Sequence, residues 1–184
     1  TLKPFTAALA LEAGRVTPDT VIQTGNGKLT VGAATISDAH PAGALTVAQV
    51  IQKSSNVGAA KLALDLPAQS MWDMFSRVGF GAPTRSGFPG EGSGKLRPYQ
   101  HWRPIEQATM AYGHGIAVTL LQLARAYTVF ASDGELKPIT LLKREEPEAG
   151  RQVIAPQVAR SVRKMLEMAV QPGGTAPRAR IMGW

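Results

Sequence analysis

The sequence of 184 residues contains no cysteine. This absence excludes disulfide bonds, a thiolate nucleophile and zinc bound by cysteine. The sequence also lacks any apolar run of the roughly 18 residues that a membrane-spanning helix requires, and no signal peptide opens it. The first residue is Thr1 rather than methionine. We therefore expect a processed or excised piece whose membrane anchor lies outside these residues.

Basic residues are in excess, but long basic runs are absent. Lys and Arg number 20 against 13 Asp and Glu, which gives a formal net charge of +7. The tightest basic groups are short: Lys143-Arg144, Arg160 with Arg163-Lys164, and Arg178 with Arg180. No RNA-binding or zinc-finger signature accompanies them. The scattered charge therefore favours a solvated basic surface over a nucleic-acid-binding one.

Signatures of metal and nucleotide sites are also missing. His40 and His101 are too isolated in the sequence to suggest the spacing of metal ligands. The chain has no phosphate-binding loop and no nucleophile elbow. We therefore expect no metal and no cofactor.

The apolar spacing predicts one mostly helical domain over residues 1–184. Apolar residues make up 44% of the chain, which is ordinary for a folded protein. The pattern predicts helices at residues 2–14, 46–66 with a pause at Ser54, 67–78, 105–113, 119–132 and 157–170. It predicts capping boxes at Thr46–Gln49 and Thr119–Gln122, short strands over 18–38, and extended chain over 135–154. Gly and Pro recur over 79–103, which indicates a long functional loop.

Lys3 is the first candidate for chemistry. Pro4 is tolerated only in the first turn of a helix, so Lys3 lies at a helix start and faces the position before Thr1. A serine there would complete S-x-x-K, a nucleophile and its base one turn apart. Lysine suits that role only if burial or nearby positive charge lowers its pKa. The alternative is a solvated lysine in a first turn.

Ser54-Ser55-Asn56 interrupts the second predicted helix. Small polar residues often end one helix and cap the next, and Asn56 would serve as an N-cap. The functional interpretation is S-x-N, in which Ser54 relays a proton while Asn56 holds Lys3 and a substrate amide. Ser54 continues the apolar stripe of Val47, Val50 and Ile51. We therefore expect it to be buried with partners.

A third candidate is the turn Gly113-His114-Gly115 between two predicted helices. The two glycines bracket the histidine and would place it at the rim of a cleft. The alternative is a helix stop with a solvated histidine, since a lone His is weak support for a site.

The order of the motifs then becomes informative. The chain runs through T-L-K-P-F, Q-K-S-S-N-V-G, S-G-F-P-G-E, W-R-P-I-E-Q-A-T-M-A-Y-G-H-G, Q-L-A-R-A-Y-T-V-F-A and G-G-T-A. This series closely resembles class B penicillin-binding proteins of Gram-negative bacteria, most of all the septal, division-specific type. The resemblance covers essentially the whole chain.

The resemblance implies part of a D,D-transpeptidase that cross-links peptidoglycan stem peptides through a serine acyl-enzyme and is acylated by β-lactams. It implies catalytic roles for Lys3, Ser54 and Asn56, and contacts of Ser55, Gly113 and His114 with the substrate or β-lactam. The implied partners are the D-Ala-D-Ala stem peptide and divisome proteins, on the periplasmic side of the inner membrane. The nucleophilic serine and the K-T-G strand would lie outside these residues, so we expect residues 1–184 alone to be inactive.

The resemblance also implies the fold. The domain would be α+β, of the penicillin-binding and serine β-lactamase-like type, and this piece would hold the helical subdomain with short strands while most of the central sheet is missing. The sheet-facing sides of helices 2–14 and 157–170 would then be exposed and apolar. We expect a complementary chain or self-association to cover them.

Other classes of function stay open at this point. A penicillin-recognising sensor or a carboxypeptidase could use the same scaffold. A non-catalytic basic binding module would show steep salt dependence of DNA binding. A catalytically dead divisome scaffold would lack the serine before Thr1.

Overall fold

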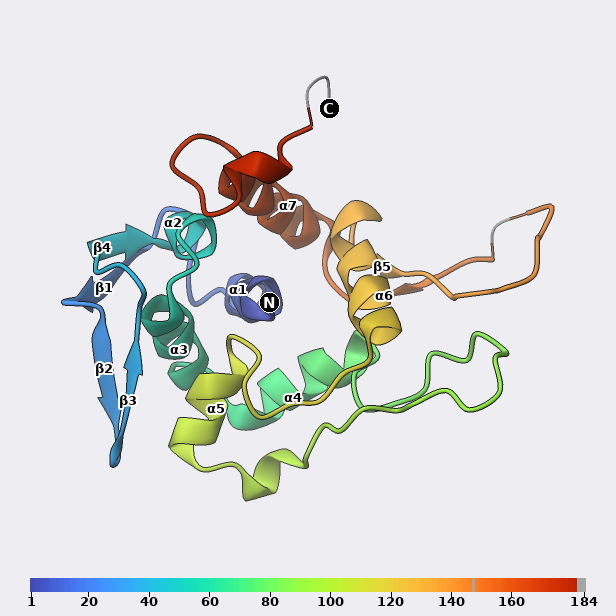
Figure 1. The fold of residues 1–184 in the computed structure, drawn as a ribbon, viewed down its shortest axis with the longest axis horizontal. Coiled ribbons are helices and arrows are strands. Elements are labelled where there is room, and N and C mark those ends of the chain that lie inside the picture. Colours follow the sequence, from blue (N-terminus) through green and yellow to red (C-terminus); the bar gives the residue numbers. More distant parts are fainter. Residues whose placement is uncertain (147, 182–184) are drawn as a thin grey trace.

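The computed structural model describes residues 1–146 and 148–181. Within these residues it contains seven α-helices and three two-stranded sheets. The helices cluster around α1, while the strands lie at the periphery (Figure 1). The expected mostly helical class, with short strands and without a large central sheet, is confirmed over the described part of the chain.

The helices and strands follow the apolar pattern closely. The helices are α1 (Lys3–Glu12), α2 (Val47–Gln52), α3 (Asn56–Leu64), α4 (Ala68–Arg77), α5 (Pro104–Met110), α6 (Leu120–Ala131) and α7 (Pro156–Val170). The strands are β1 (Val21–Gly25), β2 (Lys28–Val31), β3 (Ala34–Ser37), β4 (Gly43–Thr46), β5 (Glu135–Leu136) and β6 (Arg151–Gln152). The pairs β1–β4, β2–β3 and β5–β6 are antiparallel. The expected pause at Ser54 separates α2 from α3.

Helix α1 forms the centre of the core. Every residue from Leu2 to Ala10 is buried, and α1 packs against α2, α3, α4 and α7 (Figure 1). Phe5 is completely buried and packs edge-on against Phe80 and Tyr127. Neighbouring helices therefore cover this helix on all sides.

The expectation of exposed apolar faces on the first and last helices is wrong. Helix α1 has no exposed side within Leu2–Ala10. The exposed residues of α7 are polar or charged: Gln157, Arg160, Arg163, Lys164 and Glu167. The chain's own helices already bury the apolar stripes, because α7 turns Val158, Val162 and Met165 towards the core that α1 and α6 share.

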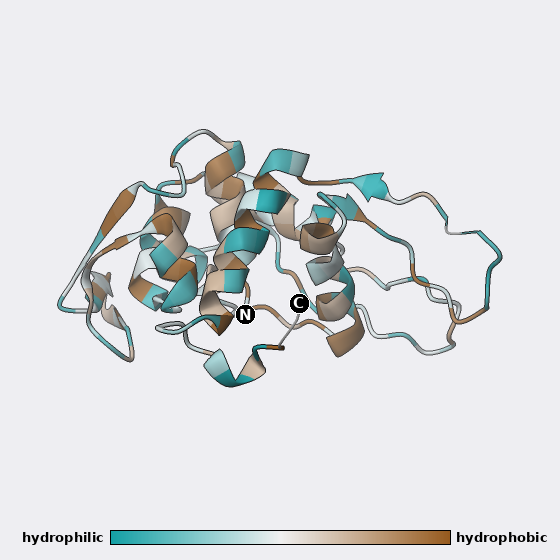
Figure 2. Cartoon of the chain, turned by 90° about the horizontal axis from the view of Figure 1, so that it is seen from above, coloured by the Kyte–Doolittle hydropathy of each residue, from teal (hydrophilic) through white to brown (hydrophobic). Residues whose placement is uncertain are grey.

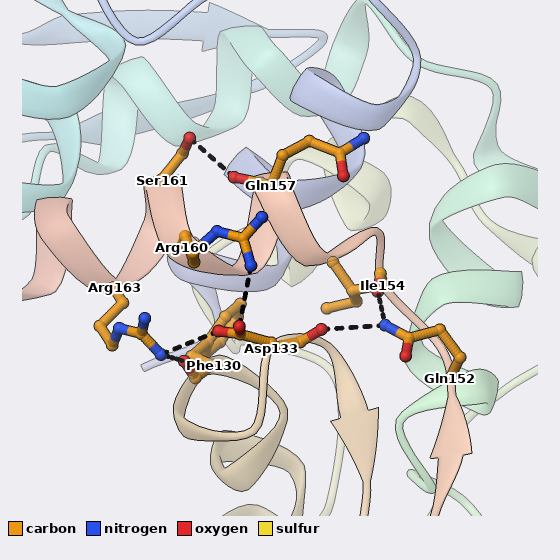
Figure 3. A network of polar contacts seen from close by, with 8 residues as sticks. All are labelled: Phe130, Asp133, Gln152, Ile154, Gln157, Arg160, Ser161 and Arg163. Carbon is orange, nitrogen blue, oxygen red and sulfur yellow. Dashed lines mark hydrogen bonds and ion pairs between the residues drawn. The ribbon is translucent and has the colours of Figure 1, made fainter.

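A network of hydrogen bonds and ion pairs connects the end of α6 to α7. Asp133 follows α6 with a left-handed backbone (φ 48°). Its carboxylate accepts hydrogen bonds from Arg160 at 2.8 Å and from Arg163 at 3.2 Å (Figure 3). Arg163 also donates to the carbonyl of Phe130 at 3.1 Å, and Gln152 donates to the carbonyl of Asp133 at 2.9 Å. One loop residue thus joins α6, α7 and the end of β6.

Two long connections extend from the end of the molecule opposite β1–β4. They are residues 81–98 and the link between β5 and β6, and both views show them at the same end (Figures 1 and 2). Glu91 closes the first connection on itself, because its carboxylate accepts from the Thr84 hydroxyl, from the Arg85 and Ser86 amides, and from the Ser86 hydroxyl. The Gly- and Pro-rich loop is therefore internally hydrogen-bonded.

Candidate active site

Lys3 and Ser54 meet at the N-terminal end of α1. Lys3 is 8% exposed, although it sits in the first turn of a helix. Its Nζ donates a 2.9 Å hydrogen bond to Ser54 Oγ. The same Nζ lies 5.8 Å from the centre of the Tyr112 ring, within the range of a cation–π contact. The alternative of a solvated Lys3, which the sequence left open, is therefore wrong.

Burial shifts the protonation equilibrium of Lys3 towards the neutral amine. Removal of the ammonium from water lowers the pKa of Lys3, and the negative charge of Asp38 acts in the opposite direction. A lowered pKa raises the fraction of neutral amine at neutral pH. A neutral amine has the free electron pair that a general base requires.

Ser54 occupies a strained turn between α2 and α3. Its backbone is left-handed (φ 56°), a conformation that few non-glycine residues adopt. Ser54 is exposed rather than buried, so the expectation that it continues the buried stripe is wrong. The left-handed turn breaks the helical periodicity and carries Ser54 away from the core, while its hydroxyl still reaches Lys3. Such strain is common at functional sites.

Hydrogen bonds of Ser55 and Asp38 hold this turn in place. Ser55 is the N-cap of α3, and its Oγ accepts from the Gly58 amide at 2.8 Å. The same hydroxyl donates to Asp38 Oδ2 at 2.6 Å. Asp38 Oδ1 accepts from the backbone amides of Asn56 and Val57. The Ser55 side chain therefore points into the protein, and its expected contact with a substrate stays a prediction that this burial disfavours.

Asn56 begins α3 rather than capping it. Its side-chain Nδ2 donates to the carbonyl of Ser37, at the end of β3, at 3.1 Å. Among the described residues no hydrogen bond joins Asn56 to Lys3, which is the contact expected from the S-x-N pattern. Asn56 is half-buried and lies two residues after Ser54. Its role towards a substrate amide stays a prediction.

The Gly113-His114-Gly115 turn lies beside the lysine. Both glycines have positive φ, 103° and 93°, and a Cβ on Gly113 would lie 3.4 Å from Leu2 Cγ. His114 is exposed and lines a cavity of about 460 Å³ whose wall includes Tyr112 and Thr109. Tyr112 therefore connects this cavity to Lys3. His114 lines this cavity, and its expected role towards a substrate stays a prediction.

Three residues at the site were not predicted from the sequence. Asp38 lies 17 residues before its partner Ser55, and only the packing of the β2–β3 hairpin on α3 brings them together. Tyr112 lies under Lys3 for a similar reason. Lys53 donates a 2.7 Å hydrogen bond to the carbonyl of Gly173, which ties the turn after α7 to the neighbour of Ser54. No periodicity or motif marks contacts of this range.

The described residues contain no cluster of three or more His, Cys, Asp or Glu side chains arranged to hold a metal ion. None of the described helices is both long enough and apolar enough to cross a bilayer. The arrangement around Lys3 consists of an amine, hydroxyls, an amide and a carboxylate. These groups suit proton transfer and acyl transfer.

Comparison with known proteins identifies the family. Residues 1–184 match the family described as the penicillin binding protein transpeptidase domain. The chain belongs to this family. The probable peptidoglycan D,D-transpeptidase PenA of Neisseria flavescens is 42% identical over the whole chain, and the peptidoglycan D,D-transpeptidase FtsI of Escherichia coli K12 is 38% identical. The chain spans 45% of the first relative and 31% of the second.

A solved transpeptidase domain has the same fold. The apo TP domain of penicillin-binding protein 3 from Burkholderia pseudomallei superposes with a TM-score of 0.96 at 50% identity. The alignment covers 100% of this chain and 56% of that structure. The family expected from the motif series is thereby confirmed.

Proposed function

We propose that the full-length protein is a peptidoglycan D,D-transpeptidase that works through a serine acyl-enzyme. The observation that carries this proposal is the buried Lys3 amine, 2.9 Å from the Ser54 hydroxyl at the start of the central helix. A lysine held this way has a lowered pKa and a hydroxyl partner for proton transfer. The names of the relatives support the same reaction.

The proposed nucleophile is a serine directly before Thr1, one helical turn from Lys3. Its hydroxyl would attack the carbonyl of the penultimate D-alanine while neutral Lys3 accepts the hydroxyl proton. Ser54 would relay that proton to the departing D-alanine amine, so the peptide bond breaks as the ester forms. An amine of a neighbouring strand would then attack the ester, transfer its own proton to the same pair and release the serine.

The remaining residues would hold the substrate. Asn56 lies beside Ser54, and its amide group suits a hydrogen bond to the backbone of the stem peptide. Gly113 and His114 would border the cavity that Tyr112 connects to Lys3. Ser55 is the weakest member of this set, because Asp38 and the α3 backbone already engage its hydroxyl.

The setting of the reaction is part of the proposal. A β-lactam carries a strained amide that the same serine could open, so we propose β-lactams as inhibitors. We also propose a septal role with divisome partners, and a periplasmic location at the inner membrane.

Intact-mass spectrometry of the full-length protein with penicillin tests the acyl-enzyme. We expect one stoichiometric adduct on the serine before Thr1. The Lys3→Ala variant should lose it, while Lys28→Ala, which removes an exposed lysine of β2, should retain it. Absence of an adduct from the folded wild-type protein would refute the proposal and favour a dead scaffold.

A second assay separates transfer from hydrolysis. The full-length protein would receive a D-Ala-D-Ala peptide with and without an added amine acceptor. A transpeptidase forms the cross-linked product when the acceptor is present. Release of D-alanine with no cross-linked product under both conditions would instead identify a carboxypeptidase.

A further inference from the structure

A second cavity lies at the end of the molecule that carries the two long connections. It has a volume of about 490 Å³, and its lining includes residues 82–85, Arg125 of α6 and residues of the link between β5 and β6. Its charged lining consists of Arg85, Arg125, Arg144 and Arg151 with one carboxylate, Glu148. None of these residues lines the Lys3–Ser54 site. The volume falls within the range of about 300–1,000 Å³ that is typical of small-ligand sites.

Most of the positive charge in this cavity is not neutralised. Arg144 pairs with Glu148 at 2.8 Å. Among the described residues, no ion pair involves Arg85, Arg125 or Arg151. The lining therefore carries three guanidinium groups beyond the one that Glu148 balances. Two further carboxylates of this segment, Glu145 and Glu146, line an adjoining hollow that shares Pro138, Arg144 and Glu148 with this cavity.

The protein positions two of these arginines through backbone carbonyls. Arg125 donates from Nε to the carbonyl of Lys137 at 2.8 Å and from a terminal nitrogen to that of Thr84 at 3.3 Å. Arg151 donates to the carbonyl of Arg77 at 2.9 Å. Each guanidinium has five N–H donors, so donors remain for a ligand after these bonds. The contacts hold the two groups in place without neutralising them.

The positive charges of Arg125 and Arg151 repel each other. Burial lowers the pKa of Arg125, the positive charge of Arg151 lowers it further, and the carboxylate of Glu91 opposes both effects. Like charges held together in a partly buried cavity are unfavourable unless an anion lies between them. The fold keeps them there through the backbone bonds described above.

We propose that this cavity binds an oxyanion of the phosphate class that carries two or more negative charges. Three of the guanidinium groups make no ion pair, which is more positive charge than the Glu91 carboxylate acting on Arg125 can balance, and their planar donor forks match the oxygen geometry of a phosphate. The four arginines and one glutamate in the lining disfavour a purely apolar ligand. This inference is independent of the proposed transpeptidase, because the two sites share no residue.

Isothermal titration of the full-length protein tests the inference with inorganic phosphate, pyrophosphate, short-chain phosphatidic acid and acetate. We expect saturable binding of phosphate-class probes that weakens at high salt, and acetate at least about tenfold weaker because it carries one charge. Binding of free phosphate or pyrophosphate identifies a soluble ligand. Binding of phosphatidic acid alone identifies a lipid headgroup. The proposal is overturned if phosphate, pyrophosphate and phosphatidic acid all fail to bind, or if acetate binds with the same affinity as they do.

Paired variants separate the cavity from nonspecific attraction. Arg85→Gln removes a side chain that makes no hydrogen bond among the described residues, so we expect an intact fold and about tenfold weaker binding. Lys28→Gln removes one exposed positive charge at the opposite end and should leave affinity unchanged. Glu148→Gln should strengthen binding, because it removes the one lining carboxylate and releases Arg144. Equal weakening by Arg85→Gln and Lys28→Gln would contradict a localised site.

Discussion

The carboxylate of Asp38 accepts a 2.6 Å hydrogen bond from the hydroxyl of Ser55. This bond connects the end of β3 to the first turn of α3. The other carboxylate oxygen accepts from the backbone amides of Asn56 and Val57. One side chain therefore satisfies free amides at a helix start and fixes the turn that carries Ser54.

Asp38→Asn should destabilise the protein and slow its acylation. The amide group keeps one acceptor oxygen but replaces the other with a donor, so it cannot serve the Ser55 hydroxyl and both amides at once. We expect a loss of about 1–3 kcal/mol in the free energy of unfolding, measured by urea denaturation. Asp73→Asn, at an exposed position of α4, is the control. Equal stability of the two variants would rule out a stabilising role for the hydrogen bonds of Asp38.

Lys3→Met should abolish penicillin acylation without loss of stability at neutral pH. Burial lowers the pKa of Lys3 below its usual 10.5, so the charged form is less favourable in the folded than in the unfolded protein. This unfavourable contribution is complete below the folded pKa and disappears as the pH rises towards 10.5. The variant's melting temperature should therefore match or exceed wild type at pH 7, and the difference should shrink at alkaline pH.

The same lowered pKa predicts the pH dependence of acylation. The rate should rise with pH as Lys3 loses its proton in the folded protein. Stopped-flow measurements with a chromogenic β-lactam on the full-length protein would record this profile. A rate that is flat across the alkaline range would contradict Lys3 as the base.

Glu91→Gln should loosen the 84–91 loop in a pH-dependent manner. Hydrogen bonds from Ser86 and Thr84 lower the pKa of Glu91 from 4.5 to about 2. A carboxylate with a depressed pKa stabilises the fold above its unfolded pKa, and this contribution is lost as the pH falls from 4.5 through about 2. The stability difference between wild type and Glu91→Gln should therefore narrow across that window. Glu167→Gln, on the exposed side of α7, should show no comparable window.

Two variants of Asp133 separate its charge from its backbone. Asp133→Asn removes the ion pairs with Arg160 and Arg163 but tolerates the left-handed backbone, whereas Asp133→Ala loses both advantages. We expect the alanine variant to melt at a lower temperature than the asparagine variant. The difference between wild type and Asp133→Asn should decrease in high salt. Identical melting of the two variants would mean that the left-handed backbone contributes nothing measurable.

The local features of the fold were predictable because they depend on residues a few positions apart. The capping boxes Thr46–Gln49 and Thr119–Gln122 are both present, since each needs only hydrogen bonds across three residues. Pro4 required a helix start at the beginning of the chain, and α1 begins at Lys3. The motif series was sufficient to predict the family, which the comparisons confirm.

The exposure of individual side chains was less predictable. The apolar stripe of α2 suggested a buried Ser54, but the left-handed turn after Lys53 ends the helical period and exposes it. The missing sheet suggested an uncovered α1, but four helices of this chain surround it. A periodic pattern says which face is apolar, and it does not say which neighbours are available to cover that face.

The sequence by itself determined the helices, their caps, the family and the candidate residues Lys3, Ser54 and Asn56, because these follow from local spacing and motif order. Only the tertiary structure decided that Lys3 is buried against Ser54, that Asp38 braces Ser55, and that four arginines line one cavity. Each of these contacts joins segments far apart in the chain. Their formation depends on the packing of whole elements, which no local pattern encodes.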